Sequence, residues 1–282
     1  MPGLEFILMN QLTWNWPLLL TLLGIVALYL FAVHRYAKGK TILLQPFCFF
    51  TGCLLLLLVV VSPFAIISHV SFSLHMIQMS ILYFIVPPLL LLGIPEQLLH
   101  RLPRLPKSSW LKMNPFPRNI ALYTFASLFL LYHTPFILTF LVGHPLLQNS
   151  YLLLLFALSF GMWHPIASPD PLLRLCTCKM KQYTFCSGLA ITPACLLFIG
   201  AAILENTSNP LLMQLTAHIC IPSSSGKPPI LPSPFNTKYD QLLAGILMMG
   251  LHKFSLAMAL RLERKISARF YAEVEKEYGD CQ

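Results

Sequence analysis

The chain alternates between long apolar runs and short polar or basic segments over almost its whole length. An apolar run of about 20 residues can cross the roughly 30 Å hydrocarbon layer of a bilayer as a helix. The pattern predicts an all-α integral membrane protein, a seven transmembrane helix bundle that forms a single domain over residues 1–282. The predicted helices are residues 17–33, 42–61, 71–92, 120–141, 146–166, 185–204 and 242–260. A flexible outer loop at 206–239 and a cytoplasmic tail at 261–282 complete the prediction.

The composition supports a membrane protein and excludes an ordinary soluble domain. Hydrophobic residues make up 56% of the chain and charged residues only 10%, whereas about a quarter of the residues in soluble domains are charged. The net charge of +9 would suit a nucleic-acid partner, but the positions of the basic residues explain it better. Of the 19 lysines and arginines, all except Lys227 and Lys238 fall on one side of the predicted bundle. By the positive-inside rule, the N-terminus is expected outside and the C-terminus in the cytoplasm, with no nucleic-acid partner.

The N-terminal segment and the cysteines refine this placement. The segment before the first helix carries Glu5 and neither lysine nor arginine, so no cleavable signal is expected and the first helix should stay in a multi-pass protein of the cell membrane. The eight cysteines do not indicate a secreted disulfide framework, because most fall in predicted helices or on the cytoplasmic side. Cys176 and Cys178 form one Cys-x-Cys pair, which is a weak metal signal without a second pair. Its role, and that of His218 and Cys220 in the outer loop, stays open.

The third predicted helix opens with soft metal donors in a segment otherwise built for lipid. His75 and Met79 are four residues apart, so a helix brings them to the same face. Met76 lies one step round the helix, and His69 lies in the preceding turn. Imidazole and thioether together form a donor set that prefers Cu(I) to hard cations. Two ordinary explanations compete with this one, because methionine often fills apolar helices and a membrane histidine can simply hydrogen-bond to a neighbouring helix.

Donors from three predicted helices fall at a similar depth. With a rise of about 1.5 Å per residue, Met79, His133 and Cys195 lie roughly 12 to 14 Å below the outer ends of their helices. His75 would lie about one turn nearer the surface, with His69 above it. The sequence therefore predicts a copper site, with Cu(I) as the metal, drawn from His75, Met79, His133, Met76, His69 and Cys195.

A series of motifs, in the order of the predicted helices, resembles a known family. The motifs are SPF, HVSFSLHMIQMSILYFIVPPLLLLGIP, LYHTP, MWHPI, ITPAC and DQLLAGILM. They are similar to those of the CtaG family of seven-helix membrane cytochrome c oxidase assembly factors. The resemblance implies a role in maturing a haem-copper oxidase of the respiratory chain by copper insertion. It also implies that His75, Met76, Met79 and His133 stand at the family's motif positions.

The chain departs from the family pattern at two places. The fifth helix begins LLQNSYLLLL, where family members usually carry a histidine, and His164 stands where a tryptophan is common. If the histidine that is missing here is a ligand in relatives, Cys195 or His144 would have to complete the site.

Two classes of function remain open on the sequence. The first is a non-enzymatic metallochaperone that holds Cu(I) near the outer membrane face and passes it to a cytochrome c oxidase subunit. The alternative is an electron-transfer protein in which His75 and His133 are the axial ligands of a b-type haem. An intramembrane metalloprotease ranks last, because the chain has no HExxH motif. A transporter is disfavoured by the lack of an inverted repeat, although Pro87 and Pro88 should kink the third helix as in transporter helices.

Overall fold

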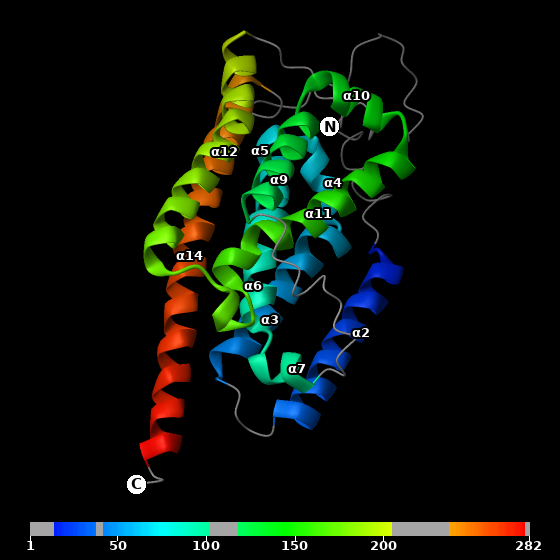
Figure 1. Ribbon diagram of the computed structural model, residues 1–282. Helices are drawn as coiled ribbons and strands as arrows, with labels where there is room; N and C mark the ends of the chain where they lie inside the picture. Colours follow the sequence, from blue (N-terminus) through cyan, green and yellow to red (C-terminus); the bar gives the residue numbers. More distant parts are fainter. Residues whose placement is uncertain (1–13, 38–41, 102–117, 205–236, 280–282) are drawn as a thin grey trace.

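The structure, a computed structural model, is helical throughout its regular elements. It describes residues 14–37, 42–101, 118–204 and 237–279 (Figure 1). These four ranges contain no strand, which confirms the predicted all-α fold. Most of the predicted outer loop, with His218 and Cys220, lies outside the described residues.

Six continuous helices in the described ranges are long and apolar enough to cross a membrane. One bent pair brings the number to seven if it counts as a single span, which confirms a multi-pass membrane protein. The first span joins α2 (Trp16–Ala32) to a π-helix, η1 (Val33–Ala37). The other five are α3 with η2 (Leu44–Leu56, Leu57–Val61), α5 with η4 and α6 (Phe72–Ser80, Ile81–Ile85, Val86–Gly93), α11 (Pro145–Ala167), α12 (Thr177–Ile203) and α14 (Lys238–Gly279).

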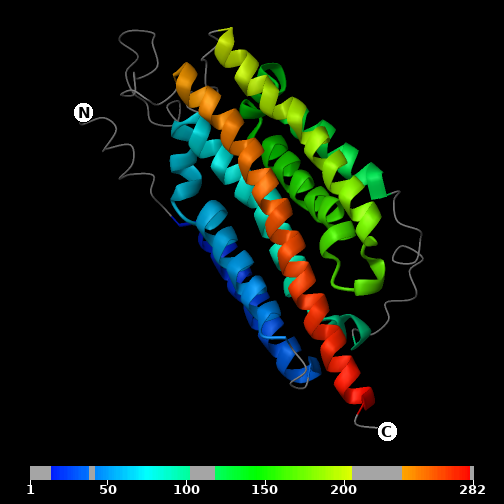
Figure 2. The same ribbon diagram turned by 90° about the vertical axis from the view of Figure 1, so that its left-hand side faces the viewer.

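The span formed by α5, η4 and α6 is the most buried of the candidate spans and runs through the middle of the bundle. The other helices surround it, and α12 and α14 lie side by side in opposite directions along one flank (Figures 1 and 2). By contrast, α2 at the edge exposes large apolar side chains, as expected for a helix that faces lipid. Within the described ranges, four short helices connect the spans: α4 (Phe64–Ile67), η3 (Ser68–Val70), α7 (Glu96–Arg101) and η5 (Pro171–Leu173).

The predicted fourth helix at 120–141 is wrong as a single straight span. The chain forms α9 (Arg118–Tyr132) and α10 (Pro135–Val142), which are bent by 75° relative to each other. Pro135 explains the break, because a proline disfavours the helical conformation in the residue before it. Thr134 is accordingly extended, with ψ of 134°. Depth counted along a straight helix down to His133 was therefore wrong, and His133 lies at the bend itself.

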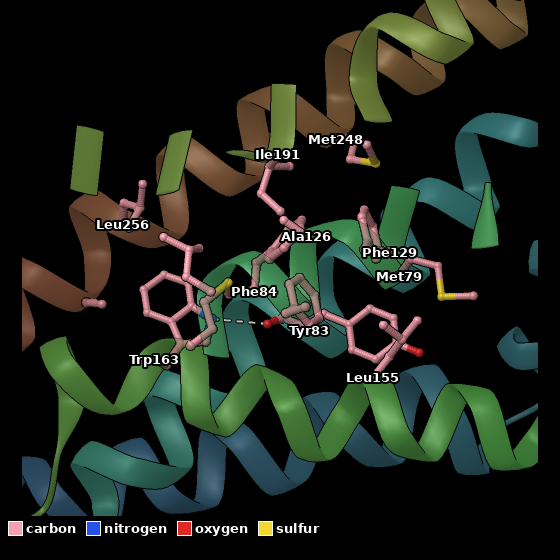
Figure 3. Close-up of a cluster of buried hydrophobic side chains, with 14 of the residues drawn as sticks. Met79, Tyr83, Phe84, Ala126, Phe129, Leu155, Trp163, Ile191, Met248 and Leu256 are labelled. Atoms are coloured by element: carbon pink, nitrogen blue, oxygen red, sulfur yellow. Dashed lines mark hydrogen bonds between the residues drawn. The ribbon is translucent and has the colours of Figure 1, made fainter. Parts of the chain in front are cut away.

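The two prolines of the third span, Pro87 and Pro88, lie at the start of α6, just after the π-helix η4. Pro87 has no N–H to donate to the carbonyl of Tyr83, four residues earlier, so that carbonyl needs another partner. The indole Nε1 of Trp163 on α11 supplies it, at 3.1 Å (Figure 3). The hydroxyl of Tyr83 in turn donates to the carbonyl of Leu152 on α11, at 3.3 Å. These bonds fasten α11 to the central span.

Candidate functional site

His75 lies in the first turn of α5 and is 4% exposed. Neither of its ring nitrogens has a hydrogen-bond partner among the described residues. Gln78, three residues further along α5, donates to the Val59 carbonyl at 2.7 Å and accepts from the Ser68 hydroxyl at 2.6 Å. A buried polar group without a partner costs about 1–3 kcal/mol. Burial of the His75 ring without a partner is therefore unfavourable unless a ligand binds there.

His133 directly follows α9, and only one of its two ring nitrogens has a hydrogen-bond partner within the described residues. Its Nδ1 lies 2.7 Å from the carbonyl oxygen of Phe129. A carbonyl only accepts, so Nδ1 carries the proton and the neutral ring has its lone pair on Nε2. Within the described part of the chain, Nε2 is buried and has no partner. This is the arrangement of a typical metal-ligating histidine, which donates its other N–H to a backbone carbonyl.

Three histidine rings follow one another at this end of the bundle. The ring centroids of His75 and His133 are 6.5 Å apart, and those of His69 and His75 are 5.9 Å apart. An imidazole binds a soft metal ion at about 2.0 Å, so one ion between two rings places their centroids about 6 Å apart. The His75–His133 spacing suits such an ion. Burial lowers the pKa of His69 from its ordinary value, which favours the neutral ring that can bind a metal.

The predicted sulfur ligands belong to the same buried core. Met76, Met79 and Cys195 are between 0% and 3% exposed, and all three belong to the main cluster of buried side chains. Phe198, one turn from Cys195 on α12, packs on His133 with 5.4 Å between ring centroids. Cys195 therefore lies on the helix that covers His133.

The structure thus brings the predicted residues together to different degrees. Direct ring contacts join His69 to His75 and His75 to His133, whereas Met76, Met79 and Cys195 share the surrounding core. Among the residues that the structure describes, no three His, Cys, Asp or Glu side chains group closely enough to hold a metal ion.

His144 and His164 lie elsewhere. His144 is exposed, packs on Phe140 with 4.7 Å between ring centroids, and places Nδ1 at 3.0 Å from the Phe140 carbonyl. His164 lies near the other end of α11, 3.3 Å from the Ser168 hydroxyl. Of the two residues expected to complete the site, Cys195 is therefore better placed than His144.

Asp240 holds the site helix in place, a role that sequence reasoning missed. Its carboxylate, 5% exposed, accepts from the Ser71 hydroxyl at 2.8 Å and from the backbone N–H groups of Phe72 and Ser73 at 3.0 and 3.2 Å. A carboxylate in this position stabilises a helix N-terminus by capping its free donors.

His252 was also missed, although a histidine inside a predicted span is itself a functional signal. It lies on α14, is 2% exposed, and has Nε2 at 3.2 Å from the hydroxyl of Ser187 on α12. Its ring packs against Phe84 with 4.8 Å between centroids.

Comparison with known proteins gives one match. The sequence model of the Caa3_CtaG family, described as cytochrome c oxidase caa3 assembly factor, matches residues 27–262. This stretch contains every predicted site residue, as well as Asp240 and His252. No curated protein and no solved structure matches the chain. The family match confirms the resemblance seen in the motifs.

Proposed function

The chain belongs to the cytochrome c oxidase caa3 assembly factor family, and from this premise we propose that it binds Cu(I) between His75 and His133 and delivers it to an oxidase subunit. The copper ion is cargo, and no bond of a substrate is made or broken. The protein therefore acts as a metallochaperone and not as an enzyme.

The observation that carries this proposal is the state of the two histidines. The proton on Nδ1 of His133 is fixed by the Phe129 carbonyl, so its free Nε2 is a ready metal donor. His75 offers two more ring nitrogens that are buried and without a partner in the described ranges. The two imidazoles are neutral, so the only charge that such a site brings into the membrane is the single positive charge of Cu(I).

The neighbouring thioethers favour Cu(I) as that ion. Met79 is one helical turn from His75 on the same face of α5, and Met76 is the next residue after His75. Thioethers select soft Cu(I), and hard cations such as Mg²⁺ and Ca²⁺ bind them poorly. A site with two nitrogens and one or two thioethers also exchanges ligands readily, because it lacks the closed thiolate shell of a structural metal site. Such a site suits a protein that must give its metal away.

The haem alternative is disfavoured by packing rather than by distance. The spacing of His75 and His133 would also suit a bis-histidine iron. However, the rings of Phe129, Tyr132 and Phe198 lie 4.5, 5.1 and 5.4 Å from that of His133, measured between centroids. A flat macrocycle inserted between the histidines would have to displace these buried rings. Purified protein with a Soret band would restore this alternative.

Copper-edge X-ray absorption of the reduced, detergent-purified protein tests the proposal. We expect a nitrogen shell at about 2.0 Å and a sulfur shell at about 2.3 Å. Met79→Leu should weaken the sulfur shell, and the matched control Met258→Leu on α14 should leave it unchanged. Protein that takes up no copper, or a spectrum with no nitrogen shell, would refute the proposal.

A further inference from the structure

Two helices that run in the same direction are held in register at the histidine end of the bundle. Asp240, in the first turn of α14, accepts a hydrogen bond from Ser71 at the start of α5. Counted from this contact at about 1.5 Å per residue, Met79 on α5 and Met248 on α14 both lie about 12 Å deeper. Both side chains are buried, at 3% and 0% exposure. Figure 3 shows them at the same end of the buried cluster, away from Trp163.

The register is confirmed further along the same two helices. By the same count, His252 lies about 18 Å below Asp240. Its ring packs on that of Phe84 in the third span. Phe84 follows Ser71 by one residue more than His252 follows Asp240, and the π-helix η4 accounts for the difference because it holds an extra residue per turn. Residues of equal count on the two helices therefore lie at similar depth.

The two helices carry the same pair of donor types in opposite order. On α5, His75 comes first and Met79 follows four residues later; on α14, Met248 comes first and His252 follows four residues later. In the observed register they form one descending series, with His75 at about 6 Å, the two methionines at about 12 Å and His252 at about 18 Å. Each step is about one helical turn.

The bond between His252 and Ser187 has an ordinary explanation, which is the joining of α12 to α14. A polar pair between membrane helices contributes modestly to their association. That explanation covers Nε2 of His252. Met248, one turn above on the same helix, belongs to the main buried cluster, where methionine is a common packing residue; the case for a site rests on the two side chains together. A neutral hydroxyl is also a weak partner that a metal ion can displace.

From this arrangement we infer that Met248 and His252 form a second Cu(I) site, which the ion reaches from His75 and His133 by way of Met79. The step is a ligand exchange in which copper stays Cu(I) and no electron is transferred. This inference rests on the proposed function, because the first site must hold copper for the second to receive it. It extends the copper path through roughly half the thickness of the bundle.

Titration of the full-length protein with Cu(I), in competition with a chromophoric Cu(I) chelator, tests the second site. Wild type should bind about two ions per chain, and Met248→Leu and His252→Asn should each bind about one. Met249→Leu, next to Met248 but only half-buried, is the matched control and should bind about two. Ser187→Ala removes the hydrogen bond but no ligand, so it should also keep about two.

The outcomes separate this inference from the proposed function. If wild type binds no Cu(I), the proposed function fails. If wild type binds about one ion and His252→Asn keeps it, the first site stands and the second is refuted. If Ser187→Ala loses copper as His252→Asn does, the pair only joins helices and the second site is likewise refuted. Oxidase activity that falls in cells making His252→Asn, but not Ser187→Ala, would support passage through His252.

Discussion

The two halves of the third span differ in how they treat buried polar groups. In the half toward α6, Trp163 donates to the Tyr83 carbonyl and the Tyr83 hydroxyl donates to Leu152. In the half that holds α5, both ring nitrogens of His75 are unpaired within the described residues. Nε2 of His133, which directly follows α9 and lies beside His75, is unpaired there too. Hydrogen bonds join helices in both halves, since Ser71 and Gln78 in the α5 half bond to Asp240 and to the Val59 carbonyl. The α5 half also holds buried unpaired nitrogens, which reduce stability by about 1–3 kcal/mol each. The unpaired nitrogens beside α5 are the feature on which the proposed copper site rests.

The largest effect on stability is expected at Asp240. Asp240→Ala would leave the Ser71 hydroxyl and two backbone N–H groups of α5 without their acceptor. The loss should be at least about 3 kcal/mol, because several buried donors are orphaned together. Thermal unfolding in detergent measures it. Asp240→Asn keeps one acceptor oxygen and should lose less, so equal stability of Asp240→Ala and wild type would contradict the capping role.

Trp163→Phe tests the half of the third span toward α6 and leaves the half that holds α5 unchanged. Phenylalanine keeps most of the apolar volume but leaves the Tyr83 carbonyl without a donor, which should cost about 1–3 kcal/mol. Copper bound per folded chain should not change. Trp14→Phe, at an exposed position, serves as the control for loss of an indole. A Trp163→Phe protein that is fully stable but loses copper would contradict both expectations.

We expect Met79→Leu to have the opposite effect to Trp163→Phe, with a small loss of stability and a loss of bound copper. The substitution nearly conserves volume, so stability should fall by less than about 1.5 kcal/mol. Bound copper should fall, because the shape is kept and the sulfur donor is lost. Thermal unfolding and metal analysis of the same preparation check both parts. A variant that keeps its copper would leave Met79 as a packing residue.

The smallest effect is expected at Cys176 and Cys178. Both are exposed at the start of α12, and one Cys-x-Cys pair is a weak metal signal. The double serine variant should keep wild-type copper content and oxidase activity. Lost oxidase activity at a normal protein level would show that copper is loaded through this pair.

The sequence predicted the spans well, because membrane thickness requires long apolar runs and little else. It missed the bend at His133, although Pro135 was visible, since the apolar run continues across the proline. It could not reveal the Asp240 cap, which joins residues 169 positions apart.

Topology stays a prediction from the basic residues. A reporter fused after Gln282 should be cytoplasmic, and one inserted near Ser224 should be external.

The sequence suggested the chemistry of the candidate site, which stays a prediction, but not the arrangement of its residues. The spacing of His75 and Met79 revealed a soft donor face, since helical periodicity alone places them together. The proximity of His69, His75 and His133 depends on how η3, α5 and α9 pack. His252 could have been found from its place in an apolar span, but its partner Ser187 lies on another helix.

Copper content of His75→Ala and His133→Ala, purified under reducing conditions, tests the central claim most directly. Both substitutions leave a cavity among buried side chains, and His133→Ala also removes the bond to the Phe129 carbonyl, so copper is measured per folded chain. Each should lose at least about 1.4 kcal/mol of binding free energy, a tenfold loss of copper affinity, and membranes should show less active oxidase. His34→Ala and His144→Ala should match wild type. Wild-type copper and a fully active oxidase in both site variants would contradict the account.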